Sequence, residues 1–167
     1  MTLVLPEIFV TAQIAKLLGV PEWRIIKFAG GKEYGIKPAL SEAAGSGTRR
    51  LYDLENVCEM ALAWWLFQAG LRSDVVGWVL NQVREKQTLK KILDIDEKRS
   101  QSLYLAVTRT EGKGWHHVPR QEVAFLEDGN QVQNLVDANG IGSGFVLLPI
   151  GTKFMGLKNK LKKLSRG

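Results

Sequence analysis

The chain has 167 residues, of which 45% are hydrophobic, and its net charge is +6. This length suits one domain with an appendage or two small domains, and the apolar share suits a globular protein with a real core. No apolar run approaches the length of a membrane span, and residues 1–7 lack the basic start of a signal peptide. We therefore expect a cytoplasmic protein with no membrane partner.

The first predicted elements are two short helices joined by a tight turn. Thr11 is assigned as the N-cap of the first helix, because its hydroxyl can accept from an orphan amide of the first turn. The apolar residues within 14–18 recur at helical spacing and form one stripe. Gly19 suits the left-handed residue that ends a helix, and Pro21 suits the first position of the next one.

The second helix is predicted from Pro21 to Phe28. Ile25 and Phe28 can pack back on the first helix. Three side chains are then free to face outward: Trp23, Arg24 and Lys27. Such a pair either reads a DNA groove or forms two core helices with a solvated basic face, and the pattern alone does not separate these interpretations.

A predicted basic wing follows. The glycines of 45–47 would let the backbone approach a partner closely. Arg49 and Arg50 match phosphate geometry, and the hydroxyl of Tyr52 can add a phosphate contact. Alternatively, this stretch is a solvated hairpin with a buried Tyr52. Asp53 is placed to cap the helix that follows, since an apolar-periodic run begins just after it.

The middle of the chain predicts a small β-rich unit. Residues 85–99 contain too few apolar positions for the heptads of a coiled coil. Strands are expected at 102–108, 122–126 and 144–150, with Pro149 at the edge or end of the last one. Residues 127–130 read as a turn, and the apolar positions of 132–136 suit a short helix or a strand.

The positive charge gathers at two ends of the chain. Residues 11–52 contain seven basic and three acidic side chains, and residues 153–167 contain six basic and no acidic ones. Two basic zones suit the binding of a polyanion. In the tail, Phe154, Leu157, Leu161 and Leu164 fall at helical spacing. This amphipathic helix could pack on the domain, pair with a second subunit or lie on a membrane surface, and a solvated basic tail is the alternative.

No catalytic arrangement stands out, so we expect neither an enzyme nor a cofactor. A single cysteine, Cys58, excludes an internal disulfide and reads as a buried structural thiol. His116 and His117 are neighbours that would point to opposite sides of an extended chain, so no metal site is expected. The glycines of 140–144 lack the Lys-Ser/Thr ending of a phosphate loop, and Trp115 could line a pocket.

The N-terminal half resembles the MerR family of winged-helix transcription regulators. Matching pieces are the helix-turn segment 14–20, the Arg50-Leu-Tyr52 wing and a further helix pair over 53–71 and 72–80. The usual Thr-Leu-Arg-Tyr-Tyr recognition helix is replaced here by residues 24–28, so that Ile26 holds the family's arginine position. The connection over 29–48 is also longer than usual for the family. Because the side chains that would read bases differ, the base preference of the family does not carry over to this chain.

Together these features predict an α+β fold, namely a winged helix-turn-helix with two further helices, a small β-rich unit and a basic C-terminal tail helix. The predicted domains are a DNA-binding domain at 1–85, a β-rich dimerisation or effector unit at 86–150 and a basic amphipathic tail at 151–167. The predicted DNA-binding residues are Thr11, Trp23, Arg24, Lys27, Arg49, Arg50 and Tyr52.

The function predicted from the sequence is sequence-specific binding of double-stranded DNA by a homodimeric transcription regulator, with the helix at 21–28 in the major groove and the wing on phosphates. The alternative is a winged-helix module for protein interaction or assembly in phage or plasmid function. A third hypothesis is a sensor whose β-rich half binds a small-molecule effector.

Overall fold

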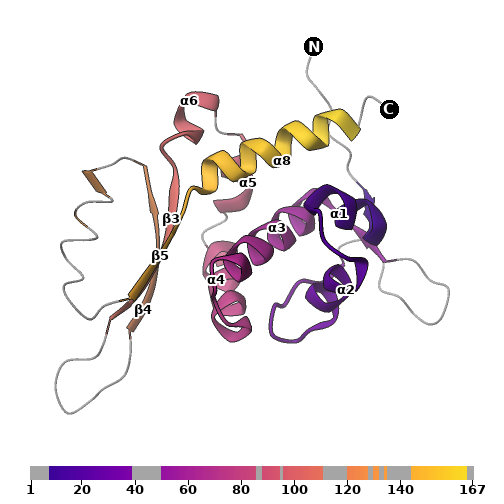
Figure 1. Cartoon of the computed structure of the whole chain (residues 1–167), viewed down its shortest axis with the longest axis horizontal. Helices are drawn as coiled ribbons and strands as arrows, with labels where there is room; N and C mark the ends of the chain where they lie inside the picture. Colours follow the sequence, from indigo (N-terminus) through magenta and orange to yellow (C-terminus); the bar gives the residue numbers. More distant parts are fainter. Residues whose placement is uncertain are drawn as a thin grey trace. The chain divides into compact units, whose positions relative to one another are not determined.

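A computed structural model of the chain shows an α+β protein, mostly helical with two small antiparallel sheets (Figure 1). It divides into two compact units, one formed by the residues up to Leu93 together with those from Gly156 onward, the other by Asp94–Met155. The structure describes residues 8–38, 50–85, 88–94, 96–110, 120–127, 130–131, 134 and 144–164.

The first unit is built from helices and one two-stranded sheet. Its helices are α1 (Thr11–Leu18), α2 (Glu22–Gly30), α3 (Leu54–Gln68), α4 (Ser73–Glu85), α5 (Thr88–Leu93) and the second half of α8 (Ile150–Leu164). Strand β1 (Phe9–Val10) pairs antiparallel with β2 (Leu51–Tyr52). The described part of the predicted wing is therefore one strand of a sheet whose other strand precedes the helix pair.

Both helices of the first pair begin one residue away from the predicted position. The N-cap of α1 is Val10, in an extended conformation, and Gln13 Oε1 accepts from its amide at 3.0 Å. The assignment of Thr11 as N-cap is wrong, because Thr11 is already the first helical residue and Val10 before it is the N-cap. Pro21 is the N-cap of α2 rather than its first helical residue.

The turn between these helices follows the predicted chemistry. Gly19 ends α1 in the left-handed conformation at φ 68°, where a side chain would be strained, and its amide donates to the carbonyl of Ala15. Ile25 and Phe28 are fully buried, so α2 turns these two residues toward the core as expected. The described residues thus confirm the helix pair and its apolar seam.

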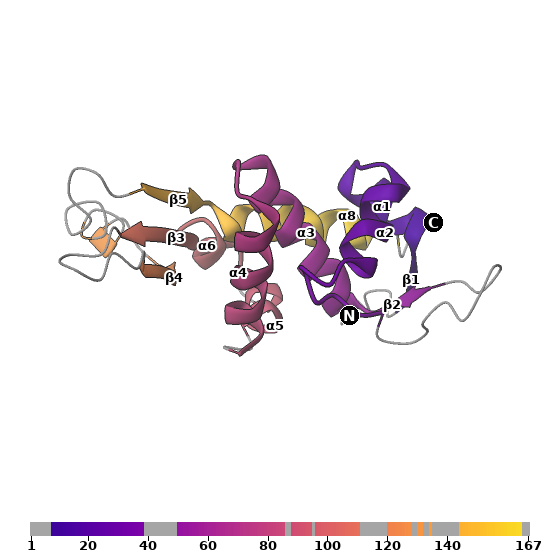
Figure 2. The same cartoon turned by 90° about the horizontal axis from the view of Figure 1, so that it is seen from below.

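Helix α3 is the centre of the first unit. Asp53 caps it as predicted, its carboxylate accepting from the Asn56 amide at 2.8 Å. The helix is buried on all sides from Asn56 to Ala63, as a helix with neighbours all round must be. It lies between α2 on one side and α4 on the other (Figures 1 and 2).

The segment after α2 is fastened to α3 and α4. Arg84 on α4 forms an ion pair with the buried Glu59 of α3 and donates to the Tyr34 carbonyl at 3.0 Å. A Cβ at Gly77 would overlap the carbonyl oxygen of Glu33, so only glycine lets the backbone cross α4 there. These contacts set the path of the chain that leaves the end of α2.

The second unit contains a three-stranded antiparallel sheet in the order β4-β3-β5 (Figure 2). Its strands are β3 (Tyr104–Thr110), β4 (Arg120–Leu126) and β5 (Gly144–Leu148), preceded by the short helix α6 (Glu97–Ser100). The predictions of strands near 102–108, 122–126 and 144–150 are confirmed, with shifted ends. Pro149 follows the last strand, since a proline cannot donate to a ladder bond.

The predicted basic tail helix is present as the larger part of α8. Phe154, Leu157 and Leu161 are buried and Leu164 is exposed, so the apolar face of this helix is packed rather than solvated. At its start, a Cβ at Gly151 would overlap the Ser100 carbonyl oxygen, and the Gly151 amide donates to Leu103 O at 3.1 Å. Among the described residues, no helix is long and apolar enough to cross a membrane.

Several predictions fall outside the described residues. These are the glycines at 45–47, Arg49, Trp115, His116, His117, the middle of the turn at 127–130, the apolar positions of 132–136 and the glycine-rich segment before Gly144.

Candidate nucleic-acid interface

The outward face of α2 is the surface on which the sequence-based hypothesis depends. Residues 23, 26, 27 and 30 follow the i, i+3, i+4, i+7 spacing that gathers side chains on one face of a helix. Trp23 is 55% exposed and Ile26 is 47% exposed, and Lys27 is exposed as well. This face lies opposite the buried Ile25 and Phe28, so it is a solvent-facing surface of mixed apolar and basic character.

Arg24 is not on that face, contrary to the prediction that it is free to point outward. Its guanidinium carbon lies 4.5 Å from the centre of the Trp23 ring, 5.3 Å from that of Trp64 and 5.6 Å from that of Phe67. Its Nε is buried and has no hydrogen-bond partner. Because residue 24 lies at the flank of the helix, its long side chain reaches the aromatic rings of α3 and stacks on them.

One of those rings, Phe67, belongs to an aromatic cluster that joins α2 to its neighbours. Phe28 and Tyr34 meet edge to face with ring centres 5.2 Å apart, and Phe67 lies 6.3 Å from each of them. Edge-to-face pairs are favourable because the positive rim of one ring meets the negative face of the other. Arg24 and this cluster together hold α2 at a defined angle on α3.

Arg50 lies beside the C-terminal end of α2. Its Nη1 donates to the carbonyl oxygen of Ile26 at 3.5 Å, a long hydrogen bond. A Cβ placed on Gly30 would lie 3.8 Å from the same nitrogen. A cation at this end of a helix is favourable because the last carbonyls carry the negative end of the helix dipole. The guanidinium therefore borders the outward face of α2.

The other predicted site residues are placed differently. Tyr52 is fully buried and its hydroxyl has no hydrogen-bond partner, so the predicted phosphate contact of this side chain is wrong. Thr11 is half-buried at the first position of α1, one helix away from the outward face of α2. Of the predicted set, the structure brings together Trp23, Lys27 and Arg50 on and beside α2, and Arg24 lies against the ring of Trp23.

Two residues at or near the helix pair were not in the predicted set. Ile26 lies between Trp23 and Gly30 on the outward face, and its spacing from Trp23 was the signal that could have found it. Lys160 of α8 donates to the carbonyl oxygen of Leu17 at 3.1 Å, at the C-terminal end of α1. That bond joins residues 143 positions apart in the sequence, so no local pattern could have predicted it.

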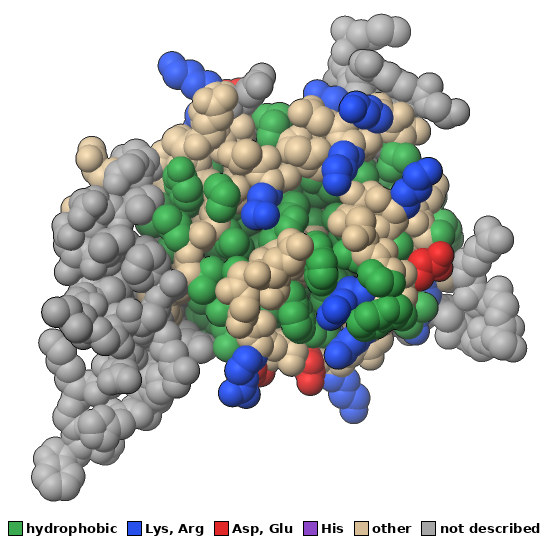
Figure 3. Space-filling model, in the orientation of Figure 1, with side chains coloured by type: hydrophobic (Ala, Val, Ile, Leu, Met, Phe, Trp, Pro, Cys, Tyr) green, Lys and Arg blue, Asp and Glu red, His purple; other side chains and the backbone are tan. Residues whose placement is uncertain are grey.

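Further basic side chains lie on α1 and on the second half of α8. Lys16 is exposed on α1, and the second half of α8 contributes only basic charges, among them Lys158, which donates to Leu93 O at 2.6 Å. Figure 3 shows Lys and Arg side chains beside hydrophobic ones, and few acidic ones, on the side of the molecule that faces the viewer in Figure 1. The potential over such a surface attracts anions.

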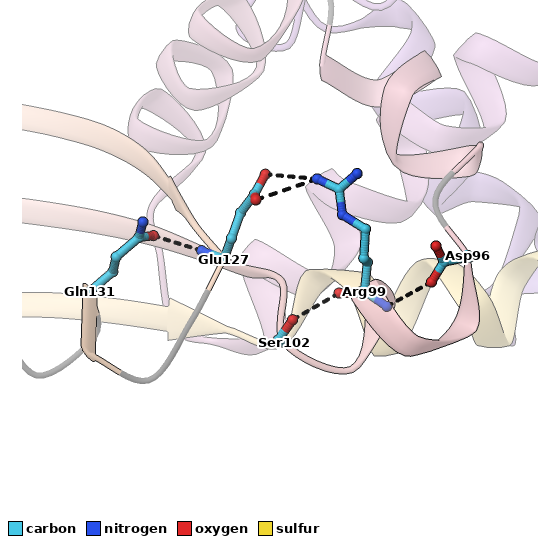
Figure 4. Close-up of polar contacts among 5 residues, drawn as sticks. All are labelled: Asp96, Arg99, Ser102, Glu127 and Gln131. Atoms are coloured by element: carbon cyan, nitrogen blue, oxygen red, sulfur yellow. Dashed lines mark hydrogen bonds and ion pairs between the residues drawn. The ribbon is translucent and has the colours of Figure 1, made fainter.

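A second polar cluster lies in the other unit (Figure 4). Arg99 pairs with Glu127 at 3.4 Å and borders a hollow of about 200 Å³ that Ser102 and Leu103 also line. Both charged side chains are more than 60% exposed, and an ion pair in that setting adds little stability or selectivity. Asp96 accepts from the Arg99 amide and Gln131 from that of Glu127, so the cluster mainly orders its own loops.

The thiol of Cys58 is shielded from solvent. Cys58 is fully buried in α3, and burial, followed by the nearby carboxylate of Glu55, raises the pKa of its thiol well above the ordinary range. Among the described residues, no group of three or more His, Cys, Asp or Glu side chains could hold a metal ion. Comparison of the sequence with protein-family models and with curated proteins gives no match.

Proposed function

We propose that this protein is a transcription regulator that binds double-stranded DNA, with the outward face of α2 in the major groove. The observation that supports this most strongly is the placement of Trp23, Ile26 and Lys27 on one exposed helix face, with Arg50 at its edge. A major groove admits an α-helix, and its base edges are read by side chains on such a face. The MerR-like resemblance of residues 14–80 is part of the proposal.

The basic surroundings support a polyanionic partner. Phosphate contacts supply a large share of the affinity of DNA-binding proteins, and cationic side chains near the element that enters the groove make many of them. Here Arg50 lies at the end of α2, while Lys16 is on the preceding helix. The proposed regulator is a homodimer, since two copies of one reading helix match a two-fold operator.

A second candidate, a protein-assembly module, is favoured by the apolar part of the same face. Exposed tryptophan and isoleucine side chains are typical of protein interfaces, and Trp23 and Ile26 are both about half exposed. A DNA regulator has a polyanionic partner, so its affinity should fall steeply as salt rises. An assembly module that binds through apolar side chains should respond much less to salt.

Selection of bound sequences from a random duplex pool, followed by affinity measurements across a salt series, tests the proposal. A DNA regulator should enrich a two-fold motif and lose affinity steeply as salt rises, with a slope that counts the neutralised phosphates. The charge-removing variant Lys27→Ala should reduce that slope, whereas Glu22→Gln on the same helix should not. Absence of enrichment, with affinity insensitive to salt, would contradict DNA binding and favour the assembly module.

A further inference from the structure

The side chains that reach the groove in the proposed complex lack the fork that reads guanine. Guanine is most often recognised by an arginine that donates two hydrogen bonds to its major-groove edge. On α2 the arginine is Arg24, and its guanidinium is stacked on rings of α2 and α3. The other arginine near this face, Arg50, donates to the carbonyl of Ile26.

Beside the exposed Lys27, the outward face of α2 presents two apolar side chains. Trp23 and Ile26 are among the most exposed large hydrophobic side chains of the described chain, and they lie one helical turn apart. Among the groups that the base edges present in the major groove, the apolar one is the 5-methyl group of thymine. Lys27 on the same face and Arg50 at its edge complement a polyanion that carries such methyl groups.

We propose that α2 recognises its site through the 5-methyl groups of thymine, with Ile26 as the main contact and Trp23 beside it. This inference rests on the proposed function and adds the chemical class of base that the site selects. Gly30, the last residue on the same face, is exposed and adds no side chain, and the Arg50 guanidinium lies beside it.

Replacing thymidine with deoxyuridine in the selected duplex tests the inference, because it removes the methyl group and leaves every hydrogen-bonding group in place. Loss of a buried methyl group corresponds to an affinity loss of about fourfold for each group contacted. Wild-type protein should therefore bind the deoxyuridine duplex several-fold more weakly. In Ile26→Ala the difference between the two duplexes should largely disappear, as expected for two partners of one contact.

Ile8→Ala is the matched control, since Ile8 is another exposed isoleucine (55%, against 47% for Ile26) and lies outside α2. This variant should keep the full discrimination between the two duplexes. Equal affinity of the wild-type protein for both duplexes would overturn the thymine inference while leaving DNA binding intact. Failure of all duplexes to bind would instead overturn the proposed function. An Ile26→Ala protein that changes from oligomer to monomer would also overturn the inference, because the face would then be a contact between protein copies.

Discussion

Replacing Arg24 with alanine distinguishes two roles of this side chain, namely positioning α2 on α3 and reading a base. The guanidinium lies within 5.6 Å of three ring centres, and its Nε is buried. A cation over an aromatic ring contributes about 0.5–1 kcal/mol when exposed and about 2 kcal/mol when desolvated. Because Arg24 is half-buried, we expect the free energy of unfolding to fall by about 1–2 kcal/mol.

Urea denaturation followed by circular dichroism measures this loss. With a slope of about 2 kcal/mol per molar urea, the midpoint should fall by about 0.5–1 M. Arg24→Lys should recover little of it, since an ammonium group cannot stack flat on a ring. Lys27→Ala is the control, because Lys27 is an exposed cation on the same helix, and its midpoint should hardly move.

Arg24→Ala should weaken binding to the selected duplex and to a random duplex by the same factor, because a displaced α2 loses its contacts with bases and with phosphates alike. The reasoning would be refuted by an unchanged urea midpoint together with a loss of roughly tenfold or more on the selected duplex alone. That outcome would mean that Arg24 leaves the rings and contacts a guanine edge.

Three further predictions concern other parts of the first unit. Arg50→Ala should weaken binding to all duplexes about equally and lower the salt slope by about one unit, and an unchanged slope would remove Arg50 from the interface. Gly77→Ala should destabilise the protein by at least about 1–3 kcal/mol, because its methyl group overlaps the Glu33 carbonyl; a wild-type melting temperature would contradict this packing. Because burial raises the pKa of the Cys58 thiol, the stability it contributes is present below the unfolded value of about 8.5 and is lost as pH rises above it. Cys58→Ala should therefore flatten the fall of stability at alkaline pH, and an identical fall in both proteins would exclude this origin.

Short-range signals in the sequence predicted the helix pair and its turn. Gly19 and Asp53 act within a few residues of their own positions, so their roles as a left-handed helix end and a helix cap could be read from neighbours alone. The alternating strands and the apolar spacing of Phe154, Leu157 and Leu161 were predictable for the same reason.

The direction of individual side chains was decided only by the tertiary structure. Arg24 was predicted to face outward, yet it turns to Trp64, forty positions further along the chain. Tyr52 was predicted at the surface and is buried. Both residues are amphipathic, so the sequence permits either placement. Which one has the lower free energy depends on the aromatic and apolar groups that distant segments bring beside them.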